Sequence, residues 1–233
     1  MKVIIALGSA GLALSLTACG SSAFPGATSA ATPAIGAGAS GAQSTSTAPE
    51  TPTPPPHAGP QSYRGTGDKI LRIKHGDELW LATLTHTGSS NFIVTALDST
   101  GQRGDSLVNE IAGYKGTVLL NAEEGSNTSA LKIQADGAWT IHLKPPSSAR
   151  RWIGTHISGK SDEVLALDTP SSGLVTMKLT HTGSSNFIVH GYTADSSESL
   201  VNEIGHYRGE VALPEGTFLI AVHADGRWTL TTS

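Results

Sequence analysis

The side chains best suited to binding chemistry in this sequence cluster in and after a segment that occurs twice. The ten residues THTGSSNFIV run from position 85 to 94 and return unchanged from 180 to 189. Imidazole and amide groups both donate and accept hydrogen bonds, and a phenol adds an aromatic face, so together they suit the hydroxyl groups of a sugar or a wall polymer. The candidate ligand-binding residues are His86, Asn91, Asn109 and Tyr114, with their counterparts His181, Asn186, Asn202 and Tyr207. If each copy of these residues bound the same polymer, the two copies together would bind it more tightly than either alone.

A structural role explains the same letters. In this interpretation each imidazole forms hydrogen bonds with backbone groups of the Gly-Ser-Ser turn, and each following asparagine caps the turn. Two copies of one fold need the same residues at these positions, which explains the identical sequence. The sequence favours this structural interpretation and leaves the binding interpretation open.

Metal binding has weak sequence support. The second module carries His181, His190, His206 and His223 among its histidines, and none of their spacings matches a zinc motif. The stretch DSTGQRGD at 98–105 carries oxygen ligands for calcium, but not in the EF-hand order. An ordinary polar loop without a metal has the same composition. We predict no metal site and no cofactor.

Catalytic motifs are also missing. The sequence shows no nucleophile-elbow serine, no paired histidines at helical spacing and no glycine loop before a lysine. Ser129 to Lys132 spells SxxK without the other elements of that machinery, and Glu123-Glu124 has no evident partner. We therefore predict that the protein is not an enzyme, unless residues distant in sequence converge.

The elements that position these residues are predicted to be strands. Only 15% of the residues are charged, 27 are glycine, and the formal net charge is −4, without a basic stripe for nucleic acid. Inward and outward residues alternate along 79–86 and 174–181, as in a half-buried strand. The SLVNEI stretches at 106–111 and 199–204 read as strand and turn, because nearby glycines disfavour a helix.

The repeat divides the chain. THTGSSNFIV recurs at an offset of 95, SLVNEI at 93 and ADGxWT at 89, a drift that indicates duplication with loop changes. We predict two tandem antiparallel β-sandwich modules, jelly-roll-like, at 61–147 and 148–233.

The ADG stretch predicts a hairpin. A three-residue loop at 135–137 pairs Ile133 with Trp139, and the second copy pairs Val222 with Trp228, so that buried faces match. Its glycine then takes the left-handed position of a bulged turn. Both tryptophans are expected to anchor the core rather than to contact a ligand.

The N-terminus predicts export and anchoring. Residues 1–18 have the short charged start and apolar run of a signal peptide, and the run is too short for a permanent membrane span. Residues 19–60 are rich in Ala, Ser, Thr and Pro and are expected to form a disordered linker. Cys19 is the only cysteine, so no disulfide can form within the chain.

Two resemblances extend these expectations. LTAC followed by Gly20 resembles the lipobox of bacterial lipoproteins, which implies that Cys19 is lipidated and becomes the first residue after cleavage. The modules resemble in layout the pre-peptidase C-terminal β-sandwich repeats of secreted bacterial proteins, and the order of TGSSNFIV, LVNEI and ADGxWT is similar to a repeat of uncharacterised bacterial lipoproteins. The likeness of the modules implies an accessory ectodomain without catalytic activity.

The expected function is therefore recognition by a lipid-anchored binding protein on the extracytoplasmic face of the cell membrane. Its partner is expected to be an envelope polysaccharide or protein, and nucleic acid is excluded by charge. A structural or accessory subunit of an envelope protein complex is the alternative, and an undetected hydrolase is third. Exposed aromatic residues on a groove would favour a glycan, and a broad apolar patch would favour a protein.

Overall fold

This computed structural model describes residues 59–74 and 77–233, and all of its strands belong to one compact unit. Cys19, the predicted signal peptide and the predicted linker up to residue 58 lie outside the described residues. Within those residues the chain is all-β, as predicted, and its one helical element is the 3-10 turn η1 (Pro146–Ser148). No helix in this part of the chain is long and apolar enough to cross a membrane.

Each module contains eight strands in its two main sheets. Those of the first are β1 (Gln61–Thr66), β2 (Lys69–Arg72), β3 (Trp80–His86), β4 (Asn91–Leu97), β5 (Arg103–Ile111), β6 (Tyr114–Leu120), β7 (Ala130–Ala135) and β8 (Ala138–Lys144). Those of the second are β10 (His156–Lys160), β11 (Glu163–Leu167), β12 (Val175–His181), β13 (Asn186–Tyr192), β14 (Ser197–Ile204), β15 (Tyr207–Leu213), β16 (Leu219–Ala224) and β17 (Arg227–Thr232). The short strand β9 (Arg150–Trp152) precedes the second set and pairs with β11 in parallel.

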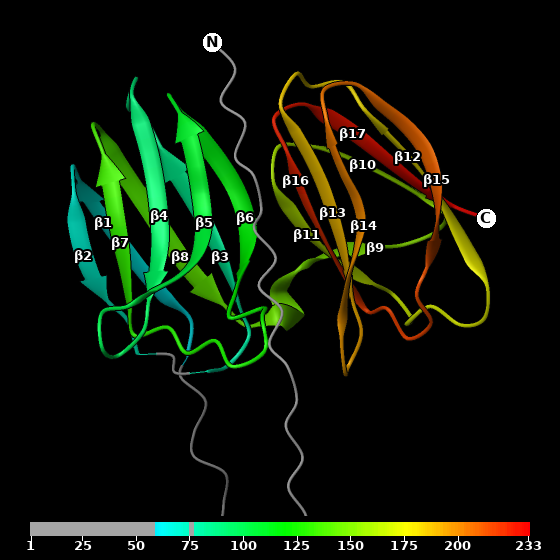
Figure 1. Cartoon of the computed structure of the whole chain (residues 1–233), viewed down its shortest axis with the longest axis horizontal. Helices are drawn as coiled ribbons and strands as arrows, with labels where there is room; N and C mark the ends of the chain where they lie inside the picture. The colour runs from blue at the N-terminus through cyan, green and yellow to red at the C-terminus, as the bar shows by residue number, and fades with distance from the viewer. Residues whose placement is uncertain (1–58, 75–76) are drawn as a thin grey trace, which may run out of the picture. The chain divides into compact units, whose positions relative to one another are not determined.

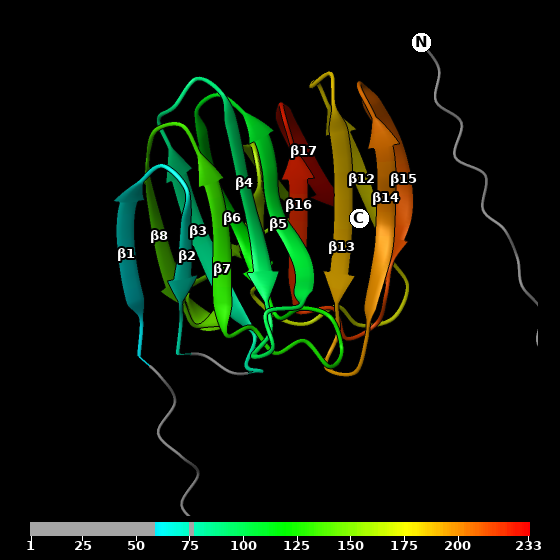
Figure 2. The same cartoon turned by 60° about the vertical axis from the view of Figure 1, so that its left-hand side comes forward.

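The strand order is that of a jelly roll in both modules (Figures 1 and 2). In the first, one sheet runs β1-β8-β3-β6 and the other β2-β7-β4-β5. In the second, the corresponding orders are β10-β17-β12-β15 and β14-β13-β16-β11-β9. Apart from β9, all pairs are antiparallel, and the sheets do not close into a barrel. The predicted fold class is confirmed.

Period-two alternation places one large side chain after another in the core. Trp139 and Trp228 are each 1% exposed, which agrees with their expected anchoring role. Each ring lies against a glycine of the neighbouring edge strand: a Cβ on Gly65 or Gly159 would stand 2.3 or 2.2 Å from the indole. Glycine at these two positions is therefore required by the close approach of the ring.

The predicted ADG hairpin is wrong. β7 and β8 lie in different sheets, so Ile133 pairs with Lys69 and Val94, and Trp139 pairs with Gly65 and His86. The chain crosses from one sheet to the other at Asp136-Gly137, and such a crossing also keeps both apolar residues facing the core. Gly137 is not among the described residues with positive φ, so its backbone does not adopt the left-handed conformation. The SLVNEI stretches, in contrast, do form strands, within β5 and β14.

Candidate functional site

The repeated histidines are the last residues of β3 and β12, at the end of each sandwich where the Gly-Ser-Ser turns lie. Nδ1–H of His86 donates to the carbonyl oxygen of Ala112 at 2.9 Å, in the turn between β5 and β6. Its ring stacks on Phe92 with 4.6 Å between centroids and 5° between planes. His181 repeats the geometry, with Nδ1 2.7 Å from the Gly205 carbonyl oxygen. Nε2 of each imidazole also lies 3.2 Å from an aspartate Oδ1, that of Asp136 or Asp225. The bond to Gly-Ser-Ser backbone that the structural interpretation predicts is present at His181, whose Nε2 accepts the N–H of Gly183 at 3.2 Å, but not at His86 among the described residues.

Aspartate caps the Gly-Ser-Ser turns. In the first module, Oδ2 of Asp136 accepts the backbone N–H groups of Ser89 and Ser90, each at 2.9 Å. Those bonds, above all the one from Ser89, lower the pKa of Asp136. Asp225 caps the equivalent turn, and there the bonds from Ser184 and Ser185 outweigh the burial that would raise its pKa. The capping role expected of Asn91 and Asn186 therefore belongs to the aspartates of the ADG stretches.

The structure separates the eight candidate binding residues into two groups. His86, His181 and Tyr114 are buried, and Tyr207 is half-buried. The side chains of Phe92 and Phe187 lie against these tyrosines, with ring centroids 5.7 and 5.6 Å apart, so the aromatic members belong to the core. All four asparagines are exposed. The asparagines are the members of the candidate set that a ligand can reach.

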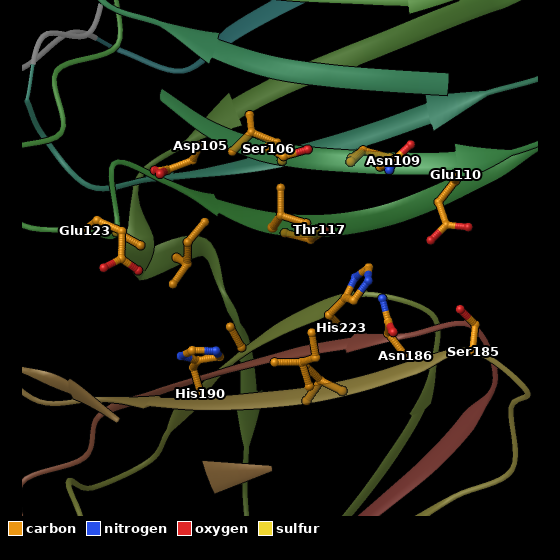
Figure 3. Close-up of a pocket in the computed structure, with 18 of the residues that line it drawn as sticks. Asp105, Ser106, Asn109, Glu110, Thr117, Glu123, Ser185, Asn186, His190 and His223 are labelled. Carbon is orange, nitrogen blue, oxygen red and sulfur yellow. The ribbon is translucent and has the colours of Figure 1, made fainter. Parts of the chain in front are cut away.

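A groove of about 690 Å³ with a mixed polar and apolar lining lies between the two modules. One wall is the edge formed by β5 and β6, and the other is the outer face of β13 and β16. Figure 3 shows Glu110 extending into the space from the first wall and His223 from the second. Among its apolar lining residues, the groove carries these acidic, imidazole and amide side chains: Asp105, Asn109, Glu110, Glu123, Asn186, His190 and His223. This groove combines residues that no single module supplies.

Asp162 joins the two walls. Its Oδ1 accepts the backbone N–H of Ala224 at 2.9 Å and lies 2.8 Å from Nδ1 of His223. Its Oδ2 accepts the hydroxyl of Tyr114, on the first module, at 2.6 Å. The matching residue of the first module, Asp68, accepts only the N–H of Ala135, at the end of β7 in the same module, among the interactions of the described residues. Asp162 is therefore a turn cap that has gained a second role between modules.

The ionisable groups around this contact have shifted pKa values. The hydrogen bond that His223 donates to Asp162 raises the pKa of His223 despite the burial of its ring. Burial, followed by the charge of Asp162, raises the pKa of Glu110 and that of Tyr114. The groove thus contains His223, which stays protonated to a higher pH than usual, and Glu110, which loses its proton at a higher pH than usual.

Apolar packing holds the walls behind this polar layer. Leu81 and Leu119 of the first module form one buried cluster with Ala149 and with Val164 and Leu219 of the second. Burial of aliphatic side chains contributes about 1.5–3 kcal/mol each when it is complete. This cluster gives the groove a packed base.

Neither an aromatic platform nor a metal cluster is present in the described part of the chain. Its tryptophans, tyrosines and phenylalanines are all buried or half-buried, and the large exposed apolar residues are the aliphatic Ile70, Ile111, Ile153, Leu174 and Ile204. No group of three or more His, Cys, Asp or Glu residues there is placed to hold a metal ion. Asp98, from the stretch considered for calcium, accepts N–H groups from Thr100 and Gln102 of its own turn.

Sequence reasoning missed the groove because its residues come from both modules. In the sequence, His223 is one of four histidines whose spacing matches no zinc motif, and Asp162 and Glu110 belong to no motif. One signal was present: His223 stands where the first module has Gln134, since these residues pair with Ile188 and Ile93 respectively.

Comparisons with known proteins leave the family open. No protein-family model matches the chain, and no curated protein matches it. A conserved protein of unknown function from Pseudomonas aeruginosa aligns over 75% of this chain and 81% of its own, with 10% identity and a TM-score of 0.23. The regulatory domain of Toxoplasma gondii PKA, crystallised with cAMP, aligns over 74% and 77%, with 7% identity and a TM-score of 0.22. Likenesses this distant carry no functional argument.

Proposed function

We propose that this protein is a lipid-anchored, non-catalytic binding protein of the outer side of the cell membrane, and that it holds an envelope polysaccharide in the groove between its modules. The observation that carries the proposal is a groove of about 690 Å³ whose walls come from both modules and carry polar side chains among apolar ones. Carboxylate, amide and imidazole groups along both walls can exchange hydrogen bonds with sugar hydroxyls. In the absence of an exposed aromatic ring among the described residues, these bonds would supply the specificity.

The charge of the groove restricts the ligand. Asp105, Glu110 and Glu123 face two histidines, His190 and His223, so carboxylates outnumber the groups that can carry a positive charge. A phosphodiester polymer would meet repulsion from these carboxylates. We therefore propose a neutral or amino-bearing polysaccharide rather than an anionic one.

Replacing Glu110 with glutamine is expected to weaken binding of a neutral wall polysaccharide by about tenfold, because a hydrogen bond to a charged acceptor is lost. Glu203→Gln is the matched control: Glu203 opposes Phe187 as Glu110 opposes Phe92, yet it is exposed and does not line the groove. Isothermal titration of the full-length chain measures both affinities. Equal losses in the two variants, or no binding by the unaltered protein, would remove the groove as the site.

Hydrolysis of the same ligand is the second candidate function, because three carboxyl groups line one groove and burial raises the pKa of Glu110. A carboxyl group with a raised pKa suits a general acid. Release of reducing ends from a bound polysaccharide distinguishes the two functions: binding alone releases none, whereas a hydrolase releases them and loses this activity in Glu110→Gln.

The anchoring part of the proposal rests on the lipobox-like LTAC and has its own test. Cys19→Ser is expected to move the protein from the membrane fraction to the soluble fraction, since the acyl chains would be its membrane attachment. Immunoblots of the two fractions measure the change. Retention of Cys19→Ser in the membrane pellet would show that something other than this cysteine holds the protein there.

A further inference from the structure

Four outward-facing residues are the same in both modules. On β4 and β5, Asn91 pairs with Ile111 and Ile93 pairs with Asn109. These residues share the outer face of the sheet, because Phe92 and Val94, which alternate with those of β4, are fully buried. On β13 and β14 the same pairs recur as Asn186 with Ile204 and Ile188 with Asn202. We call each set of four an amide–isoleucine patch.

Some outward pairs elsewhere have diverged between the modules, whereas the identical pairs Thr85–Thr140 and Thr180–Thr229 are each joined by their own hydroxyl hydrogen bond. The facing pair Thr83 and Thr117 on β3 and β6 corresponds to Lys178 and Glu210 on β12 and β15. Next to the patches themselves, Gln134 of β7 is replaced by His223 of β16. Identity across a whole outward-facing patch therefore stands out from the surface around it.

The fold gives no reason for this identity. The four asparagines are exposed, and none of their side chains makes a hydrogen bond with another described residue. Ile111 and Ile204 are each 76% exposed, which is unfavourable for a large aliphatic side chain unless something covers it. Core and turn requirements account for Phe92, His86 and their counterparts, but not for the patches.

Both patches reach the groove. Asn109 and Ile111 of the first patch line it, as do Asn186 and Ile188 of the second. Asn91 and Ile93 extend the first patch away from the groove, and Asn202 and Ile204 extend the second. The two patches and the groove thus form one continuous surface, with a groove-lining half and an outlying half in each patch.

We propose that each amide–isoleucine patch binds an acetamido group of the same ligand, and that the ligand is a linear polymer of N-acetylated hexosamines lying across both patches and the groove. This inference rests on the function proposed for the groove. An acetamido group offers one donor, one acceptor and one methyl group; an asparagine amide complements the first two, and an isoleucine side chain packs against the third. The patches carry no charge, as a neutral group requires, and two identical patches fit a ligand that repeats its own unit.

The test compares short and long oligomers of N-acetylglucosamine by isothermal titration with the full-length chain. Chitohexaose is expected to bind about 100-fold more tightly than chitobiose, because only the longer chain reaches beyond the groove. Asn91→Ala/Asn202→Ala removes amides from the outlying halves and leaves the groove lining intact. This variant is expected to keep the affinity for chitobiose and to lose most of the gain with length.

The fully deacetylated oligomer of the same length is the ligand control. It keeps the chain length and all hydroxyl groups but carries amino groups in place of the acetamido groups, so Asn91→Ala/Asn202→Ala should not change its affinity. Equal affinities for chitobiose and chitohexaose, or an unchanged length gain in the variant, would overturn the patch inference and leave the groove proposal standing. Binding of a neutral wall polysaccharide without any binding of chitohexaose would overturn the patch inference alone, and absence of both would overturn the groove proposal as well.

Discussion

Gly137→Ala is expected to destabilise the protein by about 3 kcal/mol, because the new methyl group has no room. A Cβ at this position would stand 2.5 Å from the backbone nitrogen of Gly88 and 2.6 Å from its Cα. The new methyl group would clash with backbone atoms, because the β7–β8 connection packs directly against the β3–β4 connection at this point. No side-chain rotation can therefore relieve the clash. Chemical denaturation followed by tryptophan fluorescence measures the loss.

Gly113→Ala is the matched control at the same end of the sandwich. Its Cβ would meet only the carbonyl oxygen of His86, at 3.5 Å, which is ordinary contact. Gly113 is not among the described glycines with positive φ, so alanine introduces no backbone strain there. A stability change within about 0.5 kcal/mol is expected. Similar losses in both variants would show that the crowding at Gly137 is relieved by movement of the turns.

Asp162→Ala is expected to lower the free energy of unfolding by about 3 kcal/mol, because it removes a carboxylate that is only 5% exposed and that bonds to residues of both modules. The variant leaves the hydroxyl of Tyr114, the N–H of Ala224 and the imidazole of His223 without their acceptor. Asp68→Ala, at the matching turn of the first module, removes a single backbone bond and is expected to cost about 1 kcal/mol. Equal costs in thermal unfolding would mean that the bond between the modules adds no stability.

The same contact predicts a pH dependence. Asp162 raises the pKa of His223 in the folded protein, and Glu110 and Asp225 add to the effect. The stabilisation is therefore complete below the ordinary histidine pKa of about 6.5 and is lost as pH rises through the higher folded value. Between about pH 6 and pH 9, Tm should fall further in the unaltered protein than in His223→Gln, which restores the residue of the first module. Parallel curves would contradict the prediction.

Local sequence patterns predicted the strands well, because the residues on the buried face of a strand are apolar at every second position. Trp139, Ile141 and Leu143 are all buried, as their spacing indicates. The partner of a strand is not recorded in this way. A hairpin and a crossing between sheets both keep Ile133 and Trp139 inward, so the parity of the ADG stretch could not decide between them.

The candidate site shows the same limit. The repeat identified Asn91, Asn109, Asn186 and Asn202, which are exposed, together with His86 and His181, which the folding of the turns buries. Repetition alone cannot separate residues kept by the fold from residues kept for a ligand. The groove depends on how β5 meets β13 and β16, and Asp162 acquires its role only when Tyr114 of the other module lies beside it.

The pairing of β1 with β8 determines how the first module would respond to a pull. The chain enters this module at Gln61, and β1 is an edge strand paired antiparallel with β8 from Gln61 opposite Leu143 to Thr66 opposite Ala138. A force drawn along β1 through its first residue loads all of these backbone hydrogen bonds in shear together, whereas a sideways force would open them one at a time. A module attached through this strand is mechanically strongest when the force follows the strand axis.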